Sequence, residues 1–153
     1  MAILASRSLS LTRCSGVIIG PRLVVTAAHC VVGADHVTVL LGDSADPPSR
    51  VEDASVAISN LELDLAALRV MSSRALQVPL PRLSWRNIGP TVTFVGYGRR
   101  GASSAWGKHS TSLIPWLMTE ARFVTRLAGT EAPGPCVGDS GGGAWSMGRM
   151  TLN

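Results

Sequence analysis

Short runs of alternating or branched apolar residues, each ended by glycine or proline, are the feature that most restricts the fold of this chain. Gly16–Ile19 and Leu23–Thr26 flank a Gly-Pro-Arg turn and predict a hairpin. In His36–Leu41 the apolar and polar residues alternate as in a half-buried strand. Further strands are predicted at Ala54–Ser59, Leu65–Val70, Thr91–Gly96, Ala121–Leu127 and Gly143–Met147, and one helical turn at 27–30. This pattern favours an all-β barrel or sandwich over a βαβ fold.

The composition excludes several classes of function. Hydrophobic residues make up 46% and charged residues 16% of the 153 residues, as in ordinary globular proteins. The formal charge is +4, but only Arg99 and Arg100 are adjacent, so no nucleic-acid partner is expected. Glycine and proline interrupt the longest apolar run, Val17–Val25, so no membrane span is expected. Thirteen of the 14 basic residues are arginine, which we interpret as the mark of a GC-rich bacterial genome.

Three separated motifs carry the chemistry: Thr26-Ala27-Ala28-His29-Cys30, Asp64-Leu65-Ala66-Ala67-Leu68 and Gly138-Asp139-Ser140-Gly141-Gly142-Gly143. A serine hydroxyl is a poor nucleophile at neutral pH unless a positioned base takes its proton. That base works best when a carboxylate fixes its tautomer and orientation. His29, Asp64 and Ser140 are therefore candidates for nucleophilic catalysis.

The order of the three residues along the chain excludes two other arrangements. The Gly138-x-Ser140-x-Gly142 pattern also fits the nucleophile elbow of α/β-hydrolases, which place an acidic residue and a histidine after the serine. No His, Asp or Glu follows Ser140. The subtilisin order requires an aspartate before the histidine, and no acidic residue precedes His29. Only the order His, Asp, Ser remains.

These motifs, together with Phe94-Val95-Gly96-Tyr97-Gly98, resemble the chymotrypsin-like (trypsin-fold) serine proteases. The resemblance implies two antiparallel β-barrels, with Val78-Pro79-Leu80-Pro81 in the position of the connector between them. We expect a first barrel at 1–80, which carries His29 and Asp64. We expect a partial second barrel at 81–153, which carries Ser140 and is incomplete at its C-terminus.

The resemblance also assigns roles. It implies a serine endopeptidase in which His29 is the general base, Asp64 orients it, and Ser140 is the nucleophile that forms an acyl-enzyme. The backbone N–H groups of Gly138 and Ser140 form the oxyanion hole. Because Asp64 precedes an apolar run, we expect its side chain to lie near buried surface. The implied partners are a polypeptide substrate and protein inhibitors, and no cofactor is required.

Supporting residues follow from the same resemblance. It pairs Cys14 with Cys30 and places the partner of Cys136 farther downstream than this sequence extends. Gly134 occupies the specificity position, and the lack of a carboxylate there favours a small or apolar substrate side chain. In the family, Asp139 pairs with an N-terminal amine released before an Ile/Val-Val-Gly-Gly start, which is absent here. The substitute cations for Asp139 that remain open are Arg99, Arg100 and Arg122.

Other polar residues are given structural interpretations. Asp43, Glu52 and Asp53 resemble the calcium loop of some family members, but a solvated acidic turn is favoured. His36 and His109 lack ligand spacing and are interpreted as surface or strand residues, so no metal site is predicted.

Two features of the sequence give opposite indications of where the protein is located. The expected disulfide favours a secreted or periplasmic protein. The apolar run before Ser6 has only four residues, shorter than the 7–15 residues of a secretory signal.

Two alternatives to an active protease remain. In the first alternative, the chain is a catalytically impaired homologue or fragment that acts as a binding module. In the second, it is a structural β-domain with a coincidental Gly-Asp-Ser-Gly turn. Labelling of Ser140 by a serine-reactive phosphonate separates these alternatives from the enzyme.

Overall fold

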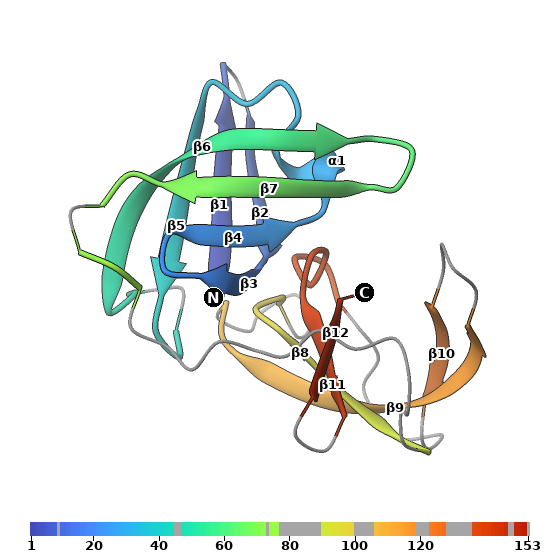
Figure 1. Cartoon of the computed structure of the whole chain (residues 1–153). Coiled ribbons are helices and arrows are strands. Elements are labelled where there is room, and N and C mark those ends of the chain that lie inside the picture. The colour runs from blue at the N-terminus through green and yellow to red at the C-terminus, as the bar shows by residue number, and fades with distance from the viewer. Residues whose placement is uncertain are drawn as a thin grey trace.

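The computed structural model of the chain describes residues 1–8, 10–44, 47–72, 74–76, 90–99, 106–118, 123–127, 136–146 and 149–152. These residues form two antiparallel β-sheets and one short helix, α1 (Ala28–Val31), as Figure 1 shows. The first sheet is built from the N-terminal part of the chain and the second from the C-terminal part. The prediction of an all-β architecture is confirmed.

The first sheet has seven strands in the order β2-β1-β5-β6-β7-β4-β3, and it curls round its own core in Figure 1. Successive side chains of a strand point to opposite faces, so β5 sends Val37 and Val39 into this core. Ile3, Val24 and Leu68 meet them there and are fully buried. The strands are β1 (Ala2–Arg7), β2 (Ser10–Ser15), β3 (Val17–Gly20), β4 (Leu23–Thr26), β5 (His36–Leu41), β6 (Arg50–Asn60) and β7 (Leu65–Val70).

The second sheet has five strands in the order β10-β9-β8-β11-β12. Val92 and Phe94 on β8 pack with Leu113 on β9 and Ala144 on β11 to form a separate small core. The strands are β8 (Val92–Gly96), β9 (His109–Met118), β10 (Phe123–Leu127), β11 (Gly143–Ser146) and β12 (Arg149–Leu152).

The two sheets meet along a seam that contains both apolar and polar contacts. Tyr97, which follows β8, packs with Ala2 and Leu40 of the first sheet. Its hydroxyl donates a hydrogen bond to the Gly42 carbonyl at 2.5 Å, and its backbone N–H donates to Ser15 Oγ at 2.8 Å. The last residue of β2 therefore lies directly against the second sheet.

Most of the predicted strands are present. The hairpin of β3 and β4, the strands β5 and β7 and the helical turn α1 are confirmed. Four strands were not predicted from the sequence: β1, β2, β9 and β12. Part of the predicted loop Gly98–Gly107 and the whole connector Val78–Pro81 lie outside the described residues, so the boundary near residue 80 stays a prediction.

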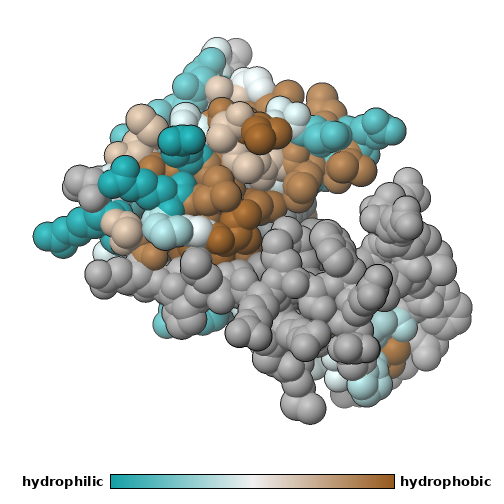
Figure 2. Space-filling view, viewed as in Figure 1, coloured by the Kyte–Doolittle hydropathy of each residue, from teal (hydrophilic) through white to brown (hydrophobic). Residues whose placement is uncertain are grey.

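Exposed hydrophobic side chains gather on the hairpin of β6 and β7. Ile58 is 71% exposed, and Leu61 and Leu63 in the turn are exposed to a similar degree. Figure 2 shows hydrophobic surface over the first sheet. The end of β6 contributes little to the core, so the turn that carries Asp64 lies in an exposed part of the molecule.

Candidate active site

Strand pairing brings His29 and Asp64 together. β4 and β7 are neighbours in the first sheet, and Thr26 pairs with Ala66. Helix α1 begins just after Thr26, and the turn containing Asp64 ends just before Ala66, so both lie at the same end of the sheet. Arg7 supports α1 by donating to the backbone carbonyls of His29 and Val32 at 3.2 and 2.8 Å. Cations near a helix C-terminus satisfy such carbonyls.

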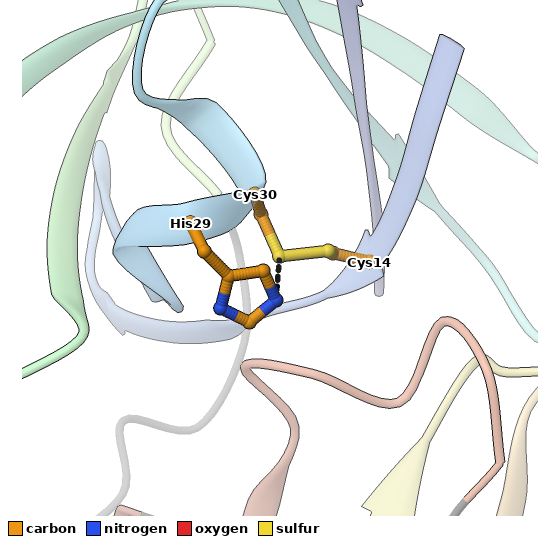
Figure 3. Close-up of side chains that lie close together, drawn as sticks. All are labelled: Cys14, His29 and Cys30. Atoms are coloured by element: carbon orange, nitrogen blue, oxygen red, sulfur yellow. Dashed lines mark hydrogen bonds between the residues drawn. A yellow bond between two sulfur atoms is a disulfide. The ribbon is translucent and has the colours of Figure 1, made fainter.

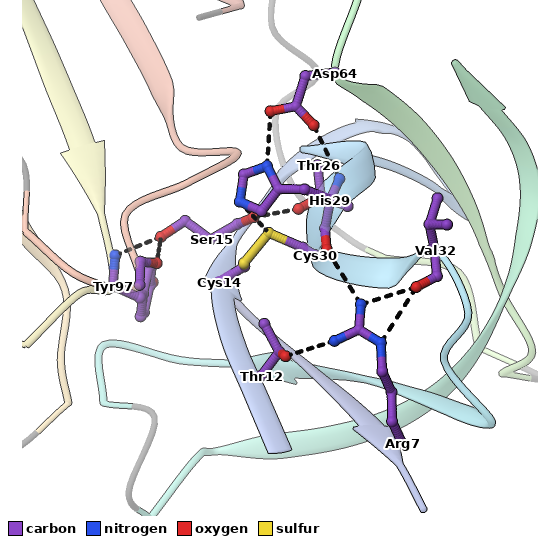
Figure 4. Close-up of a disulfide and its surroundings, with 11 residues drawn as sticks. Arg7, Thr12, Cys14, Ser15, Thr26, His29, Cys30, Val32, Asp64 and Tyr97 are labelled. Carbon is purple, nitrogen blue, oxygen red and sulfur yellow. Dashed lines mark hydrogen bonds and ion pairs between the residues drawn. A yellow bond between two sulfur atoms is a disulfide. The ribbon is translucent and has the colours of Figure 1, made fainter. Parts of the chain in front are cut away.

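His29 and Asp64 share two contacts, both of which Figure 4 draws. Asp64 Oδ2 lies 2.7 Å from His29 Nδ1, and Asp64 Oδ1 accepts the His29 backbone N–H at 2.9 Å. The Asp64 carbonyl also accepts the Ala28 N–H at 3.1 Å. Asp64 adopts a left-handed φ of 50°, which aspartate tolerates better than most residues. An ionised carboxylate only accepts, so His29 Nδ1 carries a proton and Nε2 points away from Asp64.

The electrostatics of Asp64 favour its ionised form. Desolvation of the carboxyl acts to raise its pKa. Hydrogen bonds from the His29 backbone and ring, the His29 charge and the Ala28 backbone outweigh this effect and lower the pKa below 3.8. The Asp64 side chain is 49% exposed, so the expectation that it lies near buried surface is wrong. The apolar residues after it turn inward only from Ala66 onward.

Cys14 and Cys30 form a disulfide, which confirms the pairing implied by the family resemblance. Figure 3 shows the His29 ring beside this bond, with Nε2 at 3.5 Å from Cys30 Sγ. The three ligand-type atoms of Cys14, His29 and Cys30 lie within 4.8 Å of one another. Because the two sulfurs are bonded to each other, neither is a thiolate ligand in this state. Cys136 is not part of this disulfide.

Ser140 lies in a tight loop between the sheets. Gly138 and Gly141 have φ values of 93° and 81°, which glycine adopts without strain. The Gly142 N–H donates to the Asp139 carbonyl at 2.9 Å and closes the turn. The side chain of Ser140 is exposed, while its carbonyl accepts the Ser15 N–H at 2.8 Å. Within the described residues, no hydrogen bond joins Ser140 to His29.

Asp139 has a different partner from those considered in the sequence analysis. Its carboxylate is buried and lies 2.8 Å from His109 Nε2. His109 lies on strand β9, as one interpretation expected, but its ring is not at the surface because only 8% of the side chain is exposed. Arg99 donates its backbone N–H to the Val137 carbonyl at 3.0 Å, and Arg100 and Arg122 lie outside the described residues. Sequence reasoning missed His109 because the β8–β9 pairing that brings it to Asp139 is a long-range contact.

The predicted acidic loop does not form a cation site within the described residues. Asp43 pairs with Lys108 at 3.1 Å, Asp53 pairs with His36 at 3.1 Å, and Glu52 pairs with Arg50. Glu52 and Asp53 lie on strand β6 rather than in a turn, and the Glu52 side chain is only 16% exposed, so the interpretation as a solvated acidic turn does not fit these two residues. Gly134 lies outside the described residues.

A cavity of about 870 Å³ lies between the sheets, lined by residues that include Val17, Tyr97 and Trp145. None of the predicted catalytic residues lines it.

Two antiparallel sheets, with a His–Asp pair on one and a glycine-rich serine loop on the other, define the fold of a serine protease. A model of the Trypsin family matches residues 2–152, and this chain belongs to that family. Its structure is similar to that of the serine endoprotease from Yersinia pestis, with a TM-score of 0.68 and 22% sequence identity. The match covers 97% of this chain and 50% of that chain, so this chain spans about half the length of that protein. The described residues contain no helix with the length and hydrophobicity to cross a bilayer.

Proposed function

We propose that the protein is a serine endopeptidase that cleaves polypeptides through an acyl-enzyme at Ser140. One structural link carries the proposal. Cys14 forms a disulfide with Cys30, which follows His29 in the chain. Ser15, which follows Cys14, donates its backbone N–H to the Ser140 carbonyl. Two consecutive residues thus connect the base and the nucleophile loop, which come from different sheets.

The mechanism uses the two nitrogens of His29 differently. Nδ1–H donates to Asp64, which fixes the tautomer and leaves the Nε2 lone pair to take the Ser140 proton. Ser140 Oγ attacks the peptide carbonyl, and His29 returns the proton to the departing amine. Water then attacks the acyl-enzyme with His29 again as the base, and the carboxylic acid product leaves Ser140.

The backbone at Gly138 and Ser140 supports the proposed oxyanion hole. The Val137 carbonyl accepts the Arg99 N–H at 3.0 Å. Because a trans peptide directs its N–H and C=O to opposite sides, the Gly138 N–H points away from Arg99. Within the described residues neither the Gly138 N–H nor the Ser140 N–H has an intramolecular acceptor. Both donors are therefore available to a tetrahedral intermediate.

A second candidate function is the binding of polypeptides without cleavage. It is favoured by the position of His29 Nε2, which faces Cys30 Sγ rather than Ser140. Catalysis requires this nitrogen to come within hydrogen-bonding reach of Ser140 Oγ when substrate is bound.

Labelling with a fluorophosphonate tests the proposed function. We expect one phosphonyl group at Ser140, detected by intact mass and peptide mapping. Ser140→Ala should remove the label, and His29→Ala should slow labelling by about 10³-fold or more because the general base is lost. A folded wild-type protein that takes no label supports the binding protein instead. Circular dichroism of each variant establishes that it is folded.

The substrate preference and the compartment are parts of the same proposal. With Gly134 at the specificity position, we propose cleavage after small or apolar side chains, which a peptide library tests directly. The Cys14–Cys30 disulfide supports an oxidising compartment, and so a secreted or periplasmic protein. Fractionation of the producing cells tests the location.

A further inference from the structure

The carboxylate of Asp139 is buried next to the proposed nucleophile. Asp139 is 2% exposed and immediately precedes Ser140. Oδ1 accepts the Gly98 N–H at 2.7 Å, and Oδ2 accepts the Cys136 N–H at 2.7 Å. The remaining partner is His109 Nε2, at 2.8 Å from Oδ2. A buried ionised carboxylate is costly unless it is paired and hydrogen-bonded, and these three donors satisfy it.

The surroundings of the carboxylate leave little space for it to move. A Cβ added to Gly96 or Gly98 would lie 2.1 or 2.6 Å from Asp139 Oδ1. Gly96 pairs with His109 across β8 and β9, so the strand register places the imidazole beside this same narrow space. The contact between His109 and Asp139 is therefore fixed by the second sheet itself.

His109 is a buried hydrogen-bond partner of Asp139. Nε2 faces the Asp139 carboxylate, and Nδ1 lies 3.3 Å from the Gly107 carbonyl. An ionised carboxylate only accepts, so the proton of the contact with Asp139 is carried by Nε2. The His109 side chain is 8% exposed, so water does not compete freely for this hydrogen bond.

The main chain of Asp139 transmits its position to the proposed catalytic groups. The Asp139 N–H donates to the Cys136 carbonyl at 3.0 Å, and its carbonyl accepts the Gly142 N–H. The residues on either side of Asp139 are Gly138 and Ser140, which supply the proposed oxyanion donors and the nucleophile. A displaced carboxylate would therefore shift all of these groups.

We propose that His109 is a positioning residue, which holds the Ser140 loop in its reactive conformation by donating from strand β9 a hydrogen bond to the buried carboxylate of Asp139. The proposal rests on the function proposed above and adds how the loop that carries Ser140 is held in place.

Variants of His109 test the proposal. His109→Leu removes the donor to Asp139, whereas His109→Gln keeps a side-chain N–H for Asp139. The matched control is His36→Leu, because His36 also pairs with an aspartate, Asp53, but on the surface of the first sheet. The readout is the rate of fluorophosphonate labelling of Ser140 per folded molecule. We expect labelling to fall about 10²-fold in His109→Leu, as expected when a loop is misplaced by about 1 Å. Labelling should be largely retained in His109→Gln and His36→Leu.

Two further variants keep the test decisive. If His109→Leu does not fold, His109→Asn takes its place, since its shorter amide cannot reach Asp139. In an Asp139→Asn background the His109 substitution should have little additional effect, because the residues act as a pair. Labelling at the wild-type rate in a folded His109→Leu or His109→Asn protein would overturn the proposal.

NMR separates this proposal from the proposed function. The amide signals of Gly138 and Ser140 should shift in His109→Leu but not in His36→Leu, whether or not Ser140 reacts. If the wild type takes no label and these signals still shift, the proposed function is wrong and the positioning role of His109 stands. Unchanged amide signals in a folded His109 variant refute the positioning role.

Discussion

Ser15 and Ser140 are joined across the two sheets by a hydrogen bond of 2.8 Å from the Ser15 N–H to the Ser140 carbonyl. The Ser15 hydroxyl also donates a hydrogen bond to the Gly138 carbonyl at 2.9 Å and accepts one from the Tyr97 N–H at 2.8 Å. Its carbonyl accepts the Thr26 hydroxyl at 2.7 Å. Figure 4 shows Ser15 between the disulfide and Tyr97. The N–H and the hydroxyl of this buried serine therefore connect the two sheets, while its carbonyl is bound within the first sheet.

Replacing Ser15 by alanine should weaken this connection and leave the backbone bond to Ser140 in place. Two buried groups, the Tyr97 N–H and the Gly138 carbonyl, would lose their partner. We expect the free energy of unfolding to fall by about 1–3 kcal/mol, measured by urea denaturation. Ser10→Ala, at the exposed start of β2, is the control and should have little effect. Equal stability of the two variants would contradict the role of Ser15.

Asp64 should make the stability of the protein depend on acid pH. Its pKa is lowered in the folded protein, so it contributes stability that is fully present above its ordinary pKa of 3.8. This contribution is lost as the pH falls through the lower, folded pKa. The difference in free energy of unfolding between wild type and Asp64→Asn, measured against pH, should therefore shrink in this acid range. His29→Ala should reduce the same dependence in part, because it removes the ring hydrogen bond and the charge of His29 but keeps the backbone N–H that also lowers the pKa of Asp64.

Opening the disulfide should destabilise the first sheet. A bridge over a loop of this size, with a sequence separation of 16, contributes roughly 3 kcal/mol in the chain-entropy model. We expect a Cys14→Ser, Cys30→Ser double variant to lose about this much in calorimetry, and to label more slowly at Ser140. Cys136→Ser controls for the loss of a thiol elsewhere. A double variant as stable as the wild type would show that the bridge does not constrain the unfolded chain.

Gly98→Ala should disturb the Asp139 site by steric conflict. The added Cβ would lie 2.6 Å from Asp139 Oδ1 and 2.8 Å from the Val137 carbonyl. Crowding of this kind typically costs 1–3 kcal/mol, and thermal unfolding should report it. Gly107→Ala is the matched control, because the nearest atom to its Cβ is at 3.8 Å. Similar melting temperatures for both variants would exclude the predicted conflict.

Local sequence signals predicted the parts of the fold that local physics determines. Alternation predicted β5, and the Gly-Pro turn predicted the hairpin of β3 and β4. The segments that became β1 and β2 lack regular alternation, and these strands form because each pairs with the other while β1 also adds to β5. The pairing of β1 with β5 is long-range and leaves little trace in a single segment, whereas β1 and β2 form a local hairpin, with Arg7 opposite Ser10.

In the candidate site, too, local motifs predicted some features, while others depend on long-range packing. The motifs around His29 and Asp64 predicted a contact that the structure contains, because strand pairing aligns their flanking residues. The exposure of Asp64 and the partner of Asp139 depend on how separate elements are placed together. His109 in particular carries no motif of its own, and only the register of β8 with β9 reveals it.

The connection through Ser15 has a consequence for the order of events during biosynthesis. The Ser15 hydroxyl and the Gly138 carbonyl are separated by 123 positions in the chain, and closing so long a loop is slow compared with forming local structure. The ribosome therefore releases Ser15 well before the loop that contains Gly138. The contact between β2 and the Ser140 loop can therefore form only after the rest of the first sheet and the strands β8 to β10 have been synthesised.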